Sequence, residues 1–154
     1  MNTTDHLLTI NQLHTGFRIK DTYYDPVDDV SIKLRKNEIL AIVGESGCGK
    51  STLATSIIGL HDFNKTRVTG EIIFKNKNLV KFDEEQLNTI RGEGIGMIFQ
   101  DPLSALNPLM RIEEQIAESL KYHTSFNKEE QYKRVLELLE QVGIPNPERV
   151  ARQF

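Results

Sequence analysis

A glycine-rich stretch at residues 44–51 carries the residue types that hold phosphate groups. It reads Gly-Glu-Ser-Gly-Cys-Gly-Lys-Ser and matches G-x-x-x-x-G-K-[ST] at every fixed position. Because phosphates are bulky anions, a loop that wraps them must bring its backbone N–H groups very close, which glycines permit. The pattern therefore predicts a phosphate-binding loop; the simpler interpretation is a glycine turn beside a surface lysine.

The predicted loop gives separate roles to its side chains. Lys50 is placed to bridge the β and γ phosphates of a nucleotide, and the Ser51 hydroxyl to ligate Mg²⁺. Thr52 adds a hydroxyl within reach of the α phosphate. Cys48 is either a small residue that fills the loop or, near a helix start, a reactive thiol, and the first interpretation is the simpler. The predicted nucleotide-binding loop comprises Gly44, Glu45, Ser46, Gly47, Cys48, Gly49, Lys50, Ser51 and Thr52.

The elements on either side of the loop must position it. Residues 39–43 are continuously apolar, which is typical of a strand covered on both faces in a parallel sheet. Residues 50–60 read as a helix that ends near Gly59. Such a helix points its positive end at a bound anion, so the strand, the loop and the helix agree on a phosphate site.

The rest of the pattern divides the chain into a β-rich first part and a helical last part. Alternating or apolar runs predict strands, and apolar residues at helical spacing predict amphipathic helices. Asp83 followed by Gln86, and Asn127 followed by Glu130, are typical of helix N-terminal caps. Further strands are predicted near 8–10, 17–19, 30–34, 70–74 and 97–99, and helices at 82–91, 112–120, 127–143 and from 146 onward.

Composition excludes several classes of protein. The 154 residues are 38% hydrophobic and 27% charged, with a net charge of 19 − 22 = −3 and scattered basic residues. These values are typical of a folded domain without a dedicated surface for nucleic acid. The apolar runs fall far short of the roughly 20 residues that a membrane-spanning helix needs. The histidines and the single cysteine lack the spacing of a metal site.

A second motif narrows the choice among nucleotide-binding proteins. Residues 94–108 read Gly-Ile-Gly-Met-Ile-Phe-Gln-Asp-Pro-Leu-Ser-Ala-Leu-Asn-Pro. This segment closely resembles the Q-loop of ABC transporter ATPase subunits, in the form found in the dipeptide, oligopeptide and nickel importers. Residues 27–31, 44–52 and 137–145 resemble the same branch, so the resemblance covers nearly the whole chain.

The resemblance implies roles for further residues, with ATP and Mg²⁺ as cofactors. Gln100 takes the place of the Q-loop glutamine, which approaches Mg²⁺ and the attacking water, so Lys50 and Gln100 are the expected catalytic residues and Ser51 and Gln100 the expected metal ligands. An early aromatic residue stacks on adenine in this family. Tyr23 and Tyr24 are the first candidates and Phe17 the third, unless these rings only pack.

The resemblance also implies a fold and a physiological setting. The expected fold is an α/β P-loop NTPase of the ABC type, with a mixed sheet, an antiparallel β subdomain and the beginning of a helical subdomain. Residues 1–99 are expected to form the nucleotide-binding core, and residues 100–154 the Q-loop and the helical region.

The expected function is that of an ATPase subunit of a peptide or nickel importer, peripheral on the cytoplasmic face of the membrane. Its expected partners are permease subunits, which face residues 101–108 and the helix after them, a second ATPase subunit and a separate solute-binding protein; nucleic acid is not among them.

Two motifs of the family do not occur in the 154 residues. There is no Ser-Gly-Gly signature, and no run of four apolar residues precedes Asp-Glu. We therefore expect the chain to be the first part of a larger ATPase, able to bind ATP–Mg²⁺ but inactive by itself, and prone to aggregate through exposed strand edges. The alternatives are a soluble ABC-type ATPase of translation or repair, a small-molecule kinase, and a non-enzymatic nucleotide-binding or inert fragment.

Overall fold

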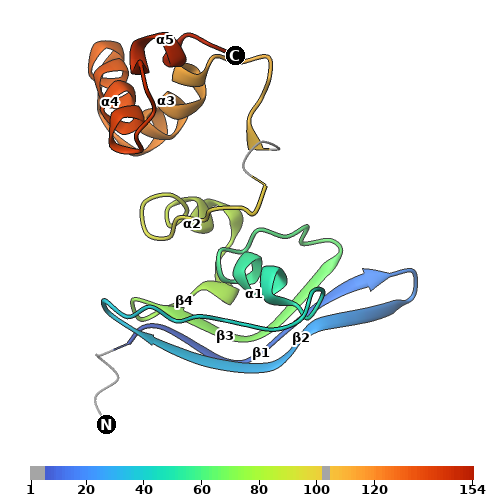
Figure 1. Cartoon of the computed structure of the whole chain (residues 1–154). Coiled ribbons are helices and arrows are strands. Elements are labelled where there is room, and N and C mark those ends of the chain that lie inside the picture. Colours follow the sequence, from blue (N-terminus) through green and yellow to red (C-terminus); the bar gives the residue numbers. More distant parts are fainter. Residues whose placement is uncertain (1–5, 102–104) are drawn as a thin grey trace. The chain divides into compact units, whose positions relative to one another are not determined.

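The chain forms two compact units, Met1–Arg91 and Gly92–Phe154. The computed structural model describes residues 6–101 and 105–154, and Figure 1 shows the elements in chain order. The first unit contains a sheet and the segment 44–51, and the second contains a group of helices. The predicted division into a nucleotide-binding core, residues 1–99, and a Q-loop and helical region, residues 100–154, stays a prediction.

A four-stranded antiparallel sheet dominates the first unit. The strands are β1 His6–Ile19, β2 Thr22–Arg35, β3 Thr66–Phe74 and β4 Lys77–Asn78. Their order is β2-β1-β3-β4, so β1 lies between the two other long strands (Figure 1). The predicted strand runs near residues 8–10 and 17–19 both fall within β1, and those at 30–34 and 70–74 fall within β2 and β3, which confirms the antiparallel β subdomain.

The core of the first unit lies on the face of the sheet that carries helix α1 Lys50–Ile57. Ile10 pairs with Ile32 on one side and Ile72 on the other, and Ile10 and Ile72 are each 1% exposed. Leu53 of α1 is also buried. Each large aliphatic side chain that is removed from water in this way contributes about 2 kcal/mol, so burial of this face holds α1 against the strands.

The short helix α2 Glu84–Asn88 begins at the predicted cap. The backbone N–H of Gln86 donates to Asp83 Oδ1 at 2.8 Å, and the backbone N–H of Asp83 donates to Gln86 Oε1 at 3.1 Å. This reciprocal pair satisfies two of the N–H groups that a helix start leaves without a partner. The helix ends earlier than the predicted residue 91, and a short 3₁₀ turn, Leu79–Lys81, precedes it.

Two predicted apolar strands are wrong. Residues 39–43 and 97–99 have no regular secondary structure, and Ile39 and Ile98 are 97% and 96% exposed. A strand needs neighbours for its backbone N–H and C=O groups, and the described residues place no strand beside either segment. Within the described chain the sheet is therefore antiparallel only, and the parallel part of the predicted mixed sheet is not formed.

Three helices pack together in the second unit: α3 Ile112–His123, α4 Lys128–Gln141 and α5 Pro147–Ala151. Their buried centre consists of Val135, Leu139 and Ala151. All three helices were predicted, and both the Asn127 cap with Glu130 and the proline at the first position of α5 are confirmed. Among the helices that the structure describes, none is long and apolar enough to cross a membrane.

Candidate nucleotide-binding site

The loop at residues 44–51 adopts a backbone that depends on its glycines. Gly47 and Gly49 have φ values of 83° and 91°, which L side chains rarely adopt. A Cβ at Gly49 would lie 2.2 Å from the Pro26 carbonyl oxygen of β2, and one at Gly44 would lie 2.7 Å from Cys48 Sγ. Glycine is therefore required at Gly49 both by the backbone torsion and by the close approach of the loop to the sheet.

The Lys50 side chain folds back over the loop. Its Nζ donates to the carbonyl oxygens of Gly44 at 2.9 Å and Glu45 at 2.6 Å, and lies 3.5 Å from Cys48 Sγ. These contacts hold an ammonium group against carbonyl oxygens of the loop, which phosphate oxygens could replace. The predicted cation of the phosphate site is thus placed within the loop itself.

The start of α1 is open toward the loop. Its N-cap residue is Gly49, and no side chain caps the helix. The first N–H groups of a helix have no partner inside the helix, and its macrodipole places partial positive charge there. Ser51 and Thr52 lie in this first turn, so their hydroxyls sit at the same positive end as Lys50. An anion at this point would receive backbone N–H groups, hydroxyls and an ammonium together.

Phe17 and Tyr24 lie on the α1 face of the sheet. They are directly paired across β1 and β2, and such pairs project their side chains to the same face. The Phe17 ring meets the ring of His61, which follows α1, edge to face with centroids 5.8 Å apart. Pro26, the contact of Gly49, is two positions from Tyr24, or about 7 Å along the strand. Phe17 and Tyr24 therefore share the face of the sheet that carries α1, and the backbone of Tyr24 is close to the point where β2 meets the loop.

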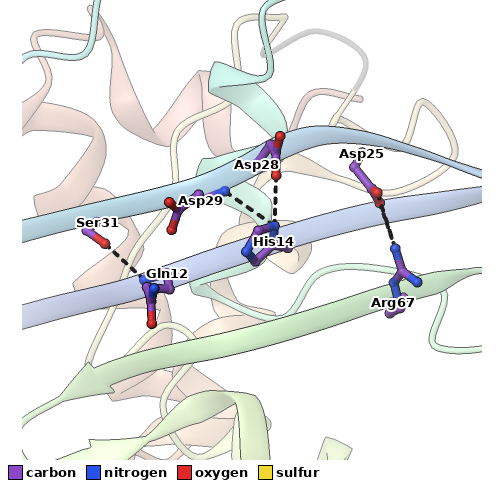
Figure 2. A network of polar contacts seen from close by, with 7 residues as sticks. All are labelled: Gln12, His14, Asp25, Asp28, Asp29, Ser31 and Arg67. Atoms are coloured by element: carbon purple, nitrogen blue, oxygen red, sulfur yellow. Dashed lines mark hydrogen bonds and ion pairs between the residues drawn. The ribbon is translucent and has the colours of Figure 1, made fainter.

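Tyr23 lies on the opposite face of the sheet. It pairs with Arg18 rather than Phe17, and the Arg67 guanidinium covers its ring at 4.5 Å from the centroid. Arg67 also bonds Asp25 at 3.2 Å, from β3 to β2 across β1 (Figure 2). The carboxylate of Asp25 lies over Gly16 of β1, so close that a Cβ there would clash with it. The two predicted tyrosines are thus on different faces, and only Tyr24 shares the face of α1.

A buried polar chain joins β1 to α1 and was missed by sequence reasoning. Thr15 Oγ1 lies 2.9 Å from Ser56 Oγ, which lies 3.0 Å from His61 Nε2 and donates to the Thr52 carbonyl at 2.7 Å. Thr15 is fully buried and Ser56 is 4% exposed. Burial lowers the pKa of His61 and favours the neutral ring. The sequence signal for Thr15 was the alternation of polar with apolar residues along its strand.

Gln100 and the segment after it belong to the second unit. Residues 102–104 of the predicted membrane-facing stretch 101–108 lie outside the described residues. Asn107 is held by Gln115 of α3: the backbone N–H of Asn107 donates to Gln115 Oε1 at 2.8 Å, and Gln115 Nε2 donates to the Asn107 carbonyl at 2.9 Å. The catalytic and metal-ligand roles of Gln100 stay predictions.

In the described part of the chain, no group of three or more His, Cys, Asp or Glu residues is arranged to hold a metal ion. Ser51 is exposed in the first turn of α1, and its role as a Mg²⁺ ligand stays a prediction.

Several known proteins are similar to this chain over most of its length. The oligopeptide transport ATP-binding protein OppD of Lactococcus lactis subsp. cremoris (strain SK11) is 46% identical over 98% of this chain and 45% of its own length. The dipeptide transport ATP-binding protein DppD of Bacillus subtilis (strain 168) is 42% identical over 97% of this chain and 45% of its own length. The chain thus spans about 45% of the length of these curated relatives.

Solved structures show the same fold. The dimeric structure of MJ0796, a bacterial ABC transporter cassette, superimposes with a TM-score of 0.80 and 26% identity, covering 95% of this chain and 60% of that chain. A post-hydrolysis state of the same cassette, bound to ADP and Pi, matches equally well. The ABC transporter family model matches residues 27–154, which include the loop at residues 44–51, helix α1 and the helices of the second unit. On this match and on the shared fold, the chain belongs to the ABC transporter family.

Proposed function

We propose that this chain is the nucleotide-binding part of an ATP-binding subunit of a peptide importer. The observation that carries the proposal is the Lys50 ammonium, held by Gly44 and Glu45 within a loop that leads into the uncapped start of α1. The names of the relatives, oligopeptide and dipeptide transport proteins, support peptides as the transported class in preference to nickel.

The proposed ligand is ATP, bound through its phosphates and its base. Lys50 neutralises the β and γ phosphates, while the N–H groups of the loop and of the first turn of α1 receive their oxygens. When bound, Mg²⁺ neutralises further phosphate charge, with Ser51 as its protein ligand. On the same face of the sheet, Tyr24 and Phe17 offer π surfaces for adenine, and we favour them over Tyr23, whose ring Arg67 already covers.

Hydrolysis is proposed for the intact transporter subunit, with Gln100 near the attacking water. Phosphoryl transfer depends on groups that position water and neutralise charge. The 154 residues contain neither Ser-Gly-Gly nor an apolar run ending in Asp-Glu. We therefore propose that this stretch alone binds ATP–Mg²⁺ without turning it over.

The proposed partners and location follow the relatives. They comprise a second ATPase subunit, permease subunits that contact residues 101–108 and α3, and a separate solute-binding protein. The dimeric state of the similar cassette supports the first of these. A subunit with these partners works at the cytoplasmic face of the membrane, held there by the permease.

A titration with a fluorescent ATP analogue tests the loop assignment. Lys50→Ala removes the cation from the loop, and we expect affinity to fall at least about tenfold, since a charge-assisted contact to phosphate is worth roughly 1.5–3 kcal/mol. Lys77→Ala, at an exposed position of β4 on the far edge of the sheet from β2, is the matched control. Equal affinity of the Lys50→Ala variant and the unsubstituted chain would contradict the proposal.

A further inference from the structure

The start of α1 has no side-chain cap, but its C-terminal end is held by hydrogen bonds from another part of the chain. A helix leaves its last carbonyl groups without partners inside the helix, and these carry partial negative charge. The chain turns away at Ile58 and at Gly59, which has a φ of 63°. The carbonyl oxygens of both residues receive hydrogen bonds from one side chain, that of Arg91.

The Arg91 guanidinium makes five hydrogen bonds. Its Nε donates to the Ile58 carbonyl at 2.9 Å and its Nη2 to the Gly59 carbonyl at 2.7 Å. On its other side it bonds Glu84 at 2.5 and 3.5 Å and Asn88 Oδ1 at 3.0 Å. Its side chain is only 21% exposed. The planar fork thus joins the end of α1 to α2 with its full set of donors, and a lysine ammonium could not match this geometry.

Close packing reinforces the same joint. Leu87 of α2 is 2% exposed, and its Cδ1 lies 2.6 Å from the position that a Cβ on Gly59 would take. The backbone N–H of Arg91 donates to the Leu87 carbonyl at 3.0 Å, so the side chain leaves from a fixed point. Gly59, Leu87 and Arg91 therefore leave little freedom for the end of α1 to shift against α2.

We propose that Arg91 is a positioning residue for the phosphate loop, acting through helix α1. The inference rests on the proposed nucleotide-binding function. Helix α1 has eight residues and is about 12 Å long, short enough to move as a rigid rod. A tilt at its far end displaces the first turn, Lys50 and the loop N–H groups together. By fixing the carbonyl end, Arg91 keeps the phosphate-binding end in the geometry that an anion needs.

This role predicts a specific pattern of binding. A misplaced loop weakens contacts to phosphate, but contacts to the base lie on the strands and do not depend on α1 in the same way. If loss of Arg91 leaves the loop correctly placed about one tenth of the time, apparent affinity for phosphate-bearing ligands falls about tenfold. A merely structural role would reduce binding of all nucleotide ligands by the same factor.

The experiment compares ATP with adenosine on the same protein. Affinities for both are measured for the unsubstituted chain and for Arg91→Ala, Arg91→Lys and a control, Arg134→Ala, which removes an arginine that bonds Glu137 in the second unit. We expect Arg91→Ala and Arg91→Lys to lower the ratio of ATP to adenosine affinity about tenfold, and Arg134→Ala to leave it unchanged. Added guanidinium ion should restore part of the ratio in Arg91→Ala.

Other outcomes separate this inference from the proposed function. A parallel loss of ATP and adenosine affinity, or an unchanged ratio, would overturn the role of Arg91 while leaving the phosphate loop in place. No preference for ATP in the unsubstituted chain would remove the proposed function and the inference with it. Should Arg91→Ala fail to fold, Asn88→Ala removes a single partner of the guanidinium, and a smaller drop in the same ratio is then required.

Discussion

Lys50 contacts backbone carbonyl oxygens of the loop that precedes helix α1, and Arg91 contacts those of the two residues that follow the helix. Lys50 could be identified from the sequence because its motif fixes glycines, lysine and serine at constant spacing. Arg91 could not, because its carbonyl partners at Ile58 and Gly59 lie 33 and 32 positions earlier and are backbone atoms without a sequence signature. The face on which each ring lies was hidden too: Tyr23 and Tyr24 are neighbours in β2 and point to opposite faces, but only the pairing of β2 with β1 shows which of them faces α1.

Gly49→Ala should damage both the fold and the phosphate site. The alanine would have to adopt a φ of 91°, which L residues rarely do, and its Cβ would lie 2.2 Å from the Pro26 carbonyl oxygen. The expected loss of stability is at least about 2 kcal/mol, with loss of ATP binding. Thermal unfolding and nucleotide titration measure the two effects. Gly96→Ala is the control, since a Cβ there meets no atom within 4 Å, and equal behaviour of the two variants would contradict the role assigned to Gly49.

The half-buried His61 should make stability depend on pH. Burial lowers its pKa in the folded chain below the usual 6.5, so the unfolded chain binds more protons as pH falls through that range. The chain is therefore most stable above the pKa that His61 has in the unfolded state, and its stability declines as pH falls below that pKa. We expect Tm to fall between about pH 7.5 and pH 5.5, and His61→Gln to flatten this dependence. His6→Gln, at the start of β1, is the control; an unchanged slope in His61→Gln would contradict the assignment.

At the scale of elements, local sequence signals predicted the helices well, but they predicted the continuously apolar strands poorly. The caps at Asp83 and Asn127 and the spaced apolar residues of α3 and α4 act within a few residues, so a sequence reveals them. The alternating strands β1 and β2 pair with each other through a tight turn. By contrast, residues 39–43 have the composition of a buried strand but no partner among the described strands, and pairing is not a local property.

The N-cap of α4 offers a test of an element by itself. Asn127 Oδ1 accepts hydrogen bonds from the backbone N–H groups of Glu129 and Glu130, each at 3.0 Å, and its own N–H donates to Glu130 Oε2 at 2.8 Å. Asn127→Ala should lower stability by about 1 kcal/mol. Asn127→Asp keeps the acceptor and should retain most of the stability. Denaturant unfolding, followed by the helical circular dichroism signal, measures both losses. Equal losses in the two variants would contradict a capping role for the Asn127 acceptor oxygen.

At the scale of the whole molecule, several of the most exposed apolar side chains of the described residues lie where strands were expected. Ile39 and Val43 are 97% and 88% exposed, and the backbone between them is not paired within the described sheet. An unpaired apolar segment of this kind is a template for association with another chain. The 154-residue chain in isolation should therefore self-associate, increasingly so at higher concentration, although its composition is that of an ordinary globular domain.

Charged substitutions in this segment test that expectation. Ile39→Lys and Val43→Lys each place a lysine where a new strand would otherwise pair, which disfavours edge-to-edge association. We expect both variants to shift the chain toward the monomer in size-exclusion chromatography with light scattering, without loss of thermal stability, because neither side chain is buried. Tyr122→Lys, which replaces a 74% exposed side chain on α3, controls for the effect of added charge alone. An equal shift in all three variants would assign the association to net charge, and a monomeric unsubstituted chain would show that residues 39–43 are protected by contacts outside the described strands.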